Sequence, residues 1–537
     1  MIDLYYYVLV PVLLATIILM WVPYAIYKRI ALATEVVLLV MAVLLFLEVK
    51  TNGPVVRTIG GWERYVGITL RADLLTCAML LLTVFLFTCA ILFNFRTPYV
   101  DKRFLFLLIT WQGLISGIFL SNDLFNIYVM IEVCTIIVSM LILYKKDKRS
   151  VYDSMFYLLL NIISALFILM GIGYLYRTVG VLDFFSIAER IAQLGDPKPL
   201  ILPYAFIMTG VSLKSALLPL FGWLPKAHGS PGAPSIVSAI LSGLYVKTGL
   251  FLFIRIQEAF AGTIDTAEFF LVVGLLTGIV GFFLAICQTD IKLILGYHTI
   301  SQVGLIMMGL TSASPAAYWG GVYHMINHAL FKSLLFLTAG IIIDTYKTRD
   351  IRELRGVLRR EPVVGVTVML AMLGIIGAPF FNGSISKYFI QEGYNNILSY
   401  GLFLINLGTV VSFIKFSVIL FGKHAGEKIR TNIYLNTVII TLGLSCFLGG
   451  IFGQPLVGIL FDQYLSFNFS VYLQKTLLFF ATLAAGLIIY FGVIMRTKFF
   501  YKIGQHEMAF NNTCLSIVVF FSALVVFLSL KYVVGLV

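Results

Sequence analysis

The sequence predicts an all-α polytopic membrane protein of about 14–16 transmembrane helices, and three observations support this fold class. Hydrophobic residues make up 60% of the 537 residues, and charged residues make up only 12%, which is about half the charged share of a soluble domain. The mean hydropathy is +0.99. Apolar stretches of about 20 residues, the length that crosses a bilayer, follow one another along the whole chain.

The spacing of these stretches predicts sixteen spans, with no soluble domain between them. Residues 5–26 are expected to be a retained first helix, because they carry neither a basic leader region nor a small-residue cleavage site. Residues 184–199 are amphipathic and predict a short interfacial helix. The predicted spans are 4–26, 30–48, 73–95, 103–121, 124–144, 155–178, 199–222, 234–256, 267–289, 292–311, 316–343, 362–394, 400–422, 433–456, 474–495 and 514–535.

The net charge of +13 does not indicate nucleic-acid binding, because the basic residues lie in short loops between apolar stretches. More than half of the 38 lysines and arginines lie in every second loop, which places them on one side of the predicted membrane. Since such loops face the cytoplasm, an even number of spans places both termini outside. We therefore expect a multi-pass protein of the plasma (inner) membrane.

The six cysteines are scattered without a CxxC or CxxCH motif. Their spacing argues against an iron–sulfur site, a c-type haem or a disulfide framework. His324 and His328 are separated by one helical turn but have no apparent third ligand partner, so a metal site is not expected. We predict that this chain carries no cofactor of its own.

Ionisable residues lie deep inside several predicted spans. Burying such a charge costs about 2.5 to over 10 kcal/mol, so the residue needs a partner, water or a function. One lysine could belong to a packing ion pair, but four on separate spans are hard to explain in that way. The residues are Glu132, Lys214, Lys247, Lys332 and Lys387.

Polar residues accompany these charges at helical spacing. Glu132 shares a helix face with Thr135 and Ser139, and Lys214 precedes the helix-breaking Pro219. A Ser stripe that includes Ser242 leads toward Lys247. The chemistry suits a proton or cation path near the bilayer midplane, because lysines and histidines can exchange protons and hydroxyls can hold water.

The second half of the chain repeats this pattern. His324, His328 and Lys332 are spaced i, i+4 and i+8 and so form one helix face, and Lys387 follows a helix break at Gly377–Gly383. Secondary candidates are His298, which could extend the path, and Lys415, which either joins it or reaches the cytoplasmic surface. Glu35 and Glu48 are expected at an interface or facing a partner helix.

At these residues the chain resembles the antiporter-like family, which includes the proton-pumping M/N-type subunits of complex I, the large D/A-type Mrp antiporter subunits and the H-type subunits of membrane-bound hydrogenases. The resemblance spans roughly residues 100–400, and the order of its motifs makes it specific. The matching strings are the span with Glu132, then LKSALLPLFGWLPKAH, APSIVSAILSGLYVKTG, QTDIKLILGYHTISQVG, HMINHALFKSLLFLTAG and GAPFFNGSISK.

The resemblance implies two inverted five-helix repeats with broken helices 7 and 12. The implied divisions are an N-terminal three-helix part at 1–99, the repeats at 100–260 and 261–425, and C-terminal helices at 426–537. It also implies roles for the charged residues. Glu132 would pair with Lys214, Lys247 and the His324–His328–Lys332 face would form a central relay, and Lys387 would be the exit-side lysine.

The chain also departs from the family pattern. The 496–513 connection is too short for a long lateral helix, and two spans follow the usual fourteen. WLPKAHGSPGAP, which contains His228, is closer to the hydrogenase and complex I relatives than to the tyrosine-containing version of the Mrp D-type subunits.

These features suggest a proton-translocating subunit, with Na⁺ exchange left open, of a hydrogenase- or complex I-related complex. The expected partners are other membrane subunits, lipid and a cytoplasmic redox arm with Fe–S clusters and a NiFe site, but no nucleic acid. The alternative is the D-type subunit of an Mrp-type Na⁺/H⁺ antiporter, and a structural membrane scaffold with buried ion pairs is the third hypothesis.

Overall fold

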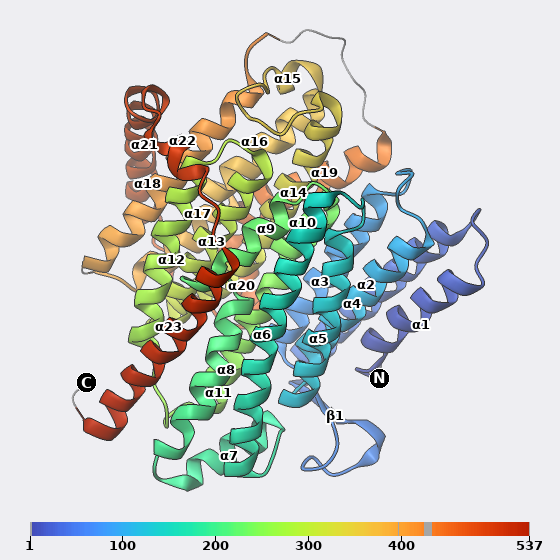
Figure 1. Ribbon diagram of the computed structural model, residues 1–537, viewed down its shortest axis with the longest axis vertical. Helices are drawn as coiled ribbons and strands as arrows, with labels where there is room; N and C mark the ends of the chain where they lie inside the picture. Colours follow the sequence, from blue (N-terminus) through green and yellow to red (C-terminus); the bar gives the residue numbers. More distant parts are fainter. Residues whose placement is uncertain (1–2, 396, 424–431, 536–537) are drawn as a thin grey trace. The chain divides into compact units, whose positions relative to one another are not determined.

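Helices make up most of the chain in the computed structural model, which describes residues 3–395, 397–423 and 432–535 (Figure 1). The chain divides into two compact units. The first comprises Met1–Ser215, Leu244–Phe269 and Phe510–Val537, and the second comprises Ala216–Gly243 and Phe270–Ala509. The fourfold division at 99, 260 and 425 stays a prediction, and its last boundary lies outside the described residues.

The first unit contains ten α-helices and one pair of antiparallel strands among its described residues. The helices are α1 (Tyr6–Met20), α2 (Tyr27–Asn52), α3 (Leu74–Phe93), α4 (Lys102–Leu120), α5 (Leu124–Ile142), α6 (Lys148–Val179), α7 (Phe184–Leu194), α8 (Ile201–Lys214), α11 (Val246–Ala259) and α23 (Phe510–Ser529). The strands β1 (Val55–Thr58) and β2 (Thr69–Ala72) form a hairpin after α2.

The second unit holds α9 (Trp223–Gly229), α10 (Ser235–Ile240), α13 (Ile291–Leu310), α14 (Pro315–Tyr346), α15 (Val357–Arg360), α16 (Pro362–Ile376), α17 (Asn382–Glu392), α18 (Ile397–Ser417), α19 (Ile433–Ile451), α20 (Gly453–Phe461), α21 (Phe469–Gly492) and α22 (Phe499–Gly504). It also holds most of α12 (Ala267–Cys287). A π-helical stretch, Leu241–Tyr245, lies between α10 and α11 in the sequence.

Thirteen helical segments of the described chain are long and apolar enough to cross a membrane, which confirms the polytopic membrane fold class. The other three predicted spans contain shorter helices. They are α1 with 15 residues, α8 with 14 and α16 with 15. The helix predicted over 184–199 is α7, whose Asp183 accepts a hydrogen bond from Ser186 N at the N-terminus.

α8 and α16 both end well inside their predicted spans. α8 ends at Lys214, and α9 begins only at Trp223, after Ala216 at a φ of 55° and Pro219. α16 ends at Ile376, and α17 begins at Asn382 after Gly377 at a φ of 77°, a left-handed conformation that suits glycine. Backbone carbonyls at such interruptions lose their intrahelical donors and can accept other hydrogen bonds.

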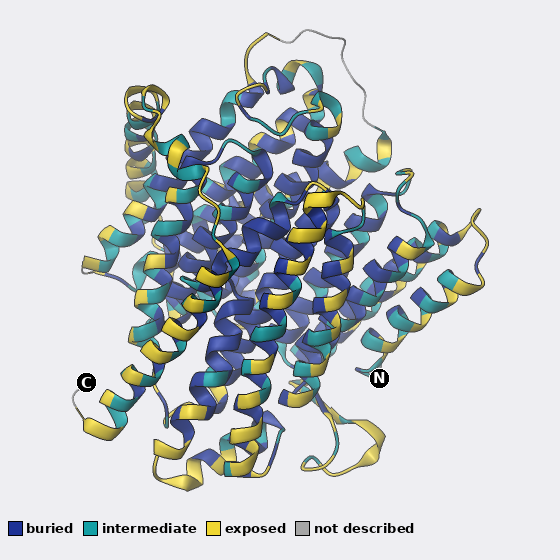
Figure 2. Cartoon of the chain, in the orientation of Figure 1, coloured by how far each residue is buried: buried dark blue, intermediate teal, exposed yellow. Residues whose placement is uncertain are grey.

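The two last long helices are packed in different ways. In the first unit, α23 lies against α6 and α8, where the Phe521 ring is 4.5 Å from that of Phe206 and 5.6 Å from that of Phe167. In the second unit, α21 packs against α18, with Gly486 facing Ile414 and Val410. Most residues of α21 are exposed (Figure 2), so this helix offers a face to lipid or to another subunit.

Candidate functional site

In the first unit, Lys214 forms a hydrogen bond at the end of α8. Its side chain is buried, and its Nζ donates to Thr135 Oγ1 of α5 at 2.8 Å. Thr135 lies one helical turn after Glu132, so the lysine and the glutamate share a neighbourhood. Among the described residues no ion pair joins them, and Glu132 Oε1 is buried without a hydrogen-bond partner. The pairing implied by the family resemblance is therefore indirect in this structure.

Thr135 connects Lys214 to further polar atoms. Its hydroxyl donates to Ile131 O at 2.9 Å and lies 3.5 Å from Tyr245 Oη. The Tyr245 ring packs edge-on against Trp111 at 5.7 Å. A short string of hydroxyls thus continues from the Lys214 ammonium into an otherwise apolar core.

Close packing brings α11 to the same place. A Cβ at Gly249 would lie 2.5 Å from Ser215 Oγ and 2.9 Å from Ser215 N, so only glycine allows this approach. Lys247 lies two residues earlier on α11 and is fully buried. The structure therefore holds Lys214 and Lys247 on two tightly packed helices of one unit.

In the second unit, α14 carries a fully buried polar face. His324 lies 2.8 Å from Ser386 Oγ through Nδ1 and 3.0 Å from Gln302 Oε1 through Nε2. The His328 ring centroid is 6.5 Å from that of His324. These contacts link α14 to α13 and α17.

Lys332 is one further turn along α14. Its Nζ donates to Leu295 O of α13 at 2.5 Å and lies 5.9 Å from the centre of the Phe336 ring. His228 stacks on the same ring at 4.5 Å. The structure thus brings His228, expected as a secondary residue, to the neighbourhood of Lys332.

The remaining secondary residues contact neighbouring helices. Ser242 Oγ is 2.7 Å from Thr299 Oγ1, and His298 Nε2 is 2.7 Å from Ser412 Oγ of α18. Lys415 is buried rather than extended to the surface. Its Nζ donates to Ile286 O at 2.6 Å and also to Gln288 O, at the end of α12, where helix carbonyls lack donors and the dipole favours a cation.

Lys387, like Lys415, is held by a carbonyl at the end of a helix, in this case α16. Its Nζ donates to Ile375 O at 2.8 Å, and its side chain runs beside Gly377, where a Cβ would lie 3.0 Å from its Cδ. The helix break after Ile376 therefore supplies the acceptor that holds the buried ammonium.

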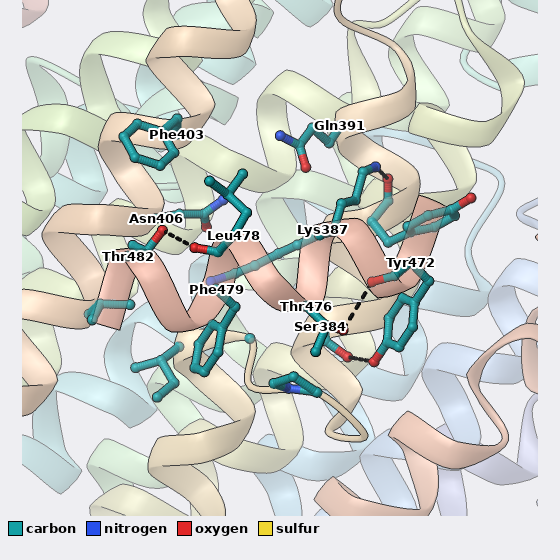
Figure 3. A pocket seen from close by; sticks show the side chains of 16 residues that line it. Ser384, Lys387, Gln391, Phe403, Asn406, Tyr472, Thr476, Leu478, Phe479 and Thr482 are labelled. Atoms are coloured by element: carbon teal, nitrogen blue, oxygen red, sulfur yellow. Dashed lines mark hydrogen bonds between the residues drawn. The ribbon is translucent and has the colours of Figure 1, made fainter. Parts of the chain in front are cut away.

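Lys387 also faces a cavity of about 90 Å³ between α17, α18 and α21 (Figure 3). Ser384 and Tyr472 line it and are joined by a 2.9 Å contact between their hydroxyls. Asn406 lines it as well, with a buried Oδ1 that has no hydrogen-bond partner in the described chain. The lining is mixed, and its polar groups offer hydrogen-bond partners to water next to Lys387.

Sequence reasoning missed one charged residue beside Lys387, and it left open which residue Glu35 contacts. Lys475 of α21 lines the cavity, although its position in the sequence indicates only a charge near a span end. Glu35, expected at an interface or facing a partner helix, is fully buried and accepts a 2.7 Å hydrogen bond from Gln112 Nε2 of α4. A carboxylate in the middle of an apolar segment was the available signal.

No cluster of three or more metal-binding side chains occurs among the described residues. The prediction of a chain without its own cofactor is left untested.

The chain matches a known family over residues 121–415, the NADH:quinone oxidoreductase/Mrp antiporter transmembrane family. It is 28% identical to the D-type subunit of a Na⁺/H⁺ antiporter from Alkalihalophilus pseudofirmus over 78% of this chain and 88% of the relative. It is 30% identical to the antiporter subunit mnhD2 of Staphylococcus aureus over 75% of this chain and 81% of the relative.

Two solved structures share the fold. A chain of the membrane-bound sulfane sulfur reductase, an archaeal respiratory membrane complex, superimposes with a TM-score of 0.79 at 23% identity, covering 90% of this chain and 99% of the other. A chain of the Mrp complex from Dietzia gives 0.78 at 21% identity, covering 89% and 99%. This chain therefore belongs to the NADH:quinone oxidoreductase/Mrp antiporter transmembrane family.

Proposed function

We propose that this chain is a proton-translocating subunit of a multisubunit complex in the plasma membrane, with both termini outside. The observation that carries the proposal is the buried Lys214 ammonium, held by Thr135 one turn from Glu132. Burying an unpaired ammonium costs several kcal/mol. One hydrogen bond of about 1.5–3 kcal/mol offsets only part of that cost, so the charge state of Lys214 responds to its surroundings.

The geometry suggests how charge is passed on. Glu132 is half-buried with an unbonded carboxylate oxygen, and it lies one turn from the hydroxyl that Lys214 contacts. When the carboxylate approaches the lysine it stabilises the ammonium, and when it withdraws the ammonium releases its proton. Lys247, the His324–His328–Lys332 face and Lys387 continue the proposed path, with His228, His298, Lys415 and Ser242 beside it.

A transport assay of the complex in proteoliposomes tests this function. Lys214→Met and Glu132→Gln should each abolish proton movement while the complex still assembles. Lys531→Met is a matched control, because Lys531 contacts only the exposed Asp265 carboxylate among the acidic groups of the described chain, at 3.2 Å. Full transport by both core variants would instead support a structural scaffold.

Two kinds of complex could contain this subunit. Relatives named as D-type subunits of Na⁺/H⁺ antiporters favour an Mrp-type antiporter, and the sulfane sulfur reductase neighbour favours a redox-driven complex with a cytoplasmic arm. Gentle extraction of the tagged chain, followed by metal analysis of the co-purifying subunits, separates them. Nickel with iron indicates a hydrogenase-like complex, iron alone a complex I or sulfur-reductase relative, and small membrane subunits without metal an Mrp antiporter.

A further inference from the structure

Two hollows meet at Lys475 of α21. The inner one is the cavity of about 90 Å³ that reaches Lys387 (Figure 3). The outer one, of about 440 Å³, is lined by Glu392, Asn395 and Lys475 near the end of α17. Gln391 and Lys475 line both hollows, so these two side chains form a border that the two hollows share.

The Lys475 ammonium is held at this junction. Its Nζ donates to Tyr388 O at 3.3 Å and lies 4.1 Å from the centre of the Tyr388 ring. Tyr388 directly follows Lys387, so α21 places a positive charge beside the backbone of the proposed proton carrier. The ring face and the carbonyl oxygen of Tyr388 both attract a cation, which keeps the Lys475 ammonium at the border of the two hollows.

The interior of the cavity lacks a compensating charge. Its polar lining consists of neutral groups and two lysines, Lys387 and Lys475, and the carboxylate of Glu392 lines only the outer hollow. The unbonded Asn406 Oδ1 indicates that a donor, such as water, belongs in this space. A hydrated metal cation that entered would meet two lysine side chains and no carboxylate.

We propose that Lys475 is a specificity-determining residue that lets water and protons reach Lys387 and keeps hydrated metal cations out. The Lys475 ammonium at the shared border repels each unit of positive charge, whereas a proton can cross along water and the Gln391, Ser384 and Tyr472 side chains. This inference rests on the proposed function in one respect, which is that Lys387 carries a proton. It also gives α21, one of the two helices beyond the usual fourteen, a part in the path.

Thiol labelling tests this proposal independently of transport. The reporter is Ser384→Cys, which places a thiol in the cavity of the assembled complex in lipid nanodiscs. The background variant is Cys514→Ser, which removes the one native cysteine that is not buried; the other five are buried. Labelling rates are compared for anionic and cationic methanethiosulfonates of similar size. Asn406→Cys is a second reporter in case the first variant does not fold. Ile488→Cys, which is 73% exposed on α21, is the lipid-facing control and should react with neither.

We expect the cavity cysteine to react faster with the anionic reagent, and Lys475→Gln to lower the anionic-to-cationic rate ratio roughly tenfold. Lys475→Arg should keep the ratio, and Lys498→Gln, which removes a lysine outside both hollows, should not change it. A purely anchoring role for Lys475 predicts an unchanged ratio in Lys475→Gln. That result, or the absence of labelling at both reporters, would overturn the proposal.

Discussion

Thr135→Val removes the hydroxyl that accepts the hydrogen bond of Lys214 while keeping the volume of the side chain. The bond is 2.8 Å long and both residues are buried, so water does not readily replace the lost oxygen. A hydrogen bond to a charged group contributes about 1.5–3 kcal/mol. Since about 1.4 kcal/mol corresponds to a factor of ten, the protonated form of Lys214 should become roughly 10- to 150-fold less favourable.

The consequence for transport can be measured with a pH-sensitive dye in proteoliposomes that contain the assembled complex. Thr135→Val should lower the initial rate of proton movement by at least about tenfold at neutral pH. Thr135→Ser keeps the hydroxyl and should retain most of the activity. If valine transports as fast as the wild type, or if serine is as impaired as valine, the reasoning about Lys214 and its hydroxyl partner is refuted.

Three further outcomes are expected. Gly249→Ala should destabilise the first unit by about 1–3 kcal/mol, because its Cβ would lie 2.5 Å from Ser215 Oγ, whereas Gly173→Ala, with open space around it, should leave the thermal unfolding midpoint nearly unchanged. Glu35→Leu should lower the thermal unfolding midpoint more than Glu35→Gln, because leucine leaves the buried Gln112 amide without its acceptor, which costs about 1–3 kcal/mol of stability. Equal midpoints for the two variants would contradict this. Arg352→Gln should raise the pKa of Asp350 toward its ordinary value, because the hydrogen bond from Arg352 holds that pKa low. The contribution of this pair is present above the ordinary pKa and fades as the pH falls through the lowered one. The variant should therefore be less stable than the wild type at neutral pH, and the two unfolding curves should converge in acid.

The map of spans could be predicted from sequence because the bilayer imposes a length on each apolar segment. Each of the sixteen predicted ranges contains a described helix or a pair of helices. Segments with a break were the hardest to delimit. α8 and α16 stop at 14 and 15 residues, since positive φ values near Ala216 and Gly377 end the regular hydrogen bonding.

The charged residues were identifiable one by one, but their partners were not. A lysine in an apolar stretch can be recognised from sequence because burying its charge costs free energy. Which atom receives its hydrogen bond depends on helices distant in sequence, as for Lys214 with Thr135 and for Lys415 with the end of α12. Glu35 was expected at an interface or facing a partner helix, and it faces α4, where Gln112, 77 residues away, supplies its hydrogen bond.

Hydropathy along the chain was enough to predict the membrane-spanning class, the approximate spans and the glutamate and lysines deep inside them, because each is a property of a single segment. Only the packing of the helices brought Thr135 Oγ1 to the Lys214 ammonium and helix-end carbonyls to Lys387 and Lys415. It also placed Lys475 at the border that the two hollows share. The physical reason is that hydropathy acts within one segment, whereas hydrogen bonds and cavities arise only where separate segments pack together.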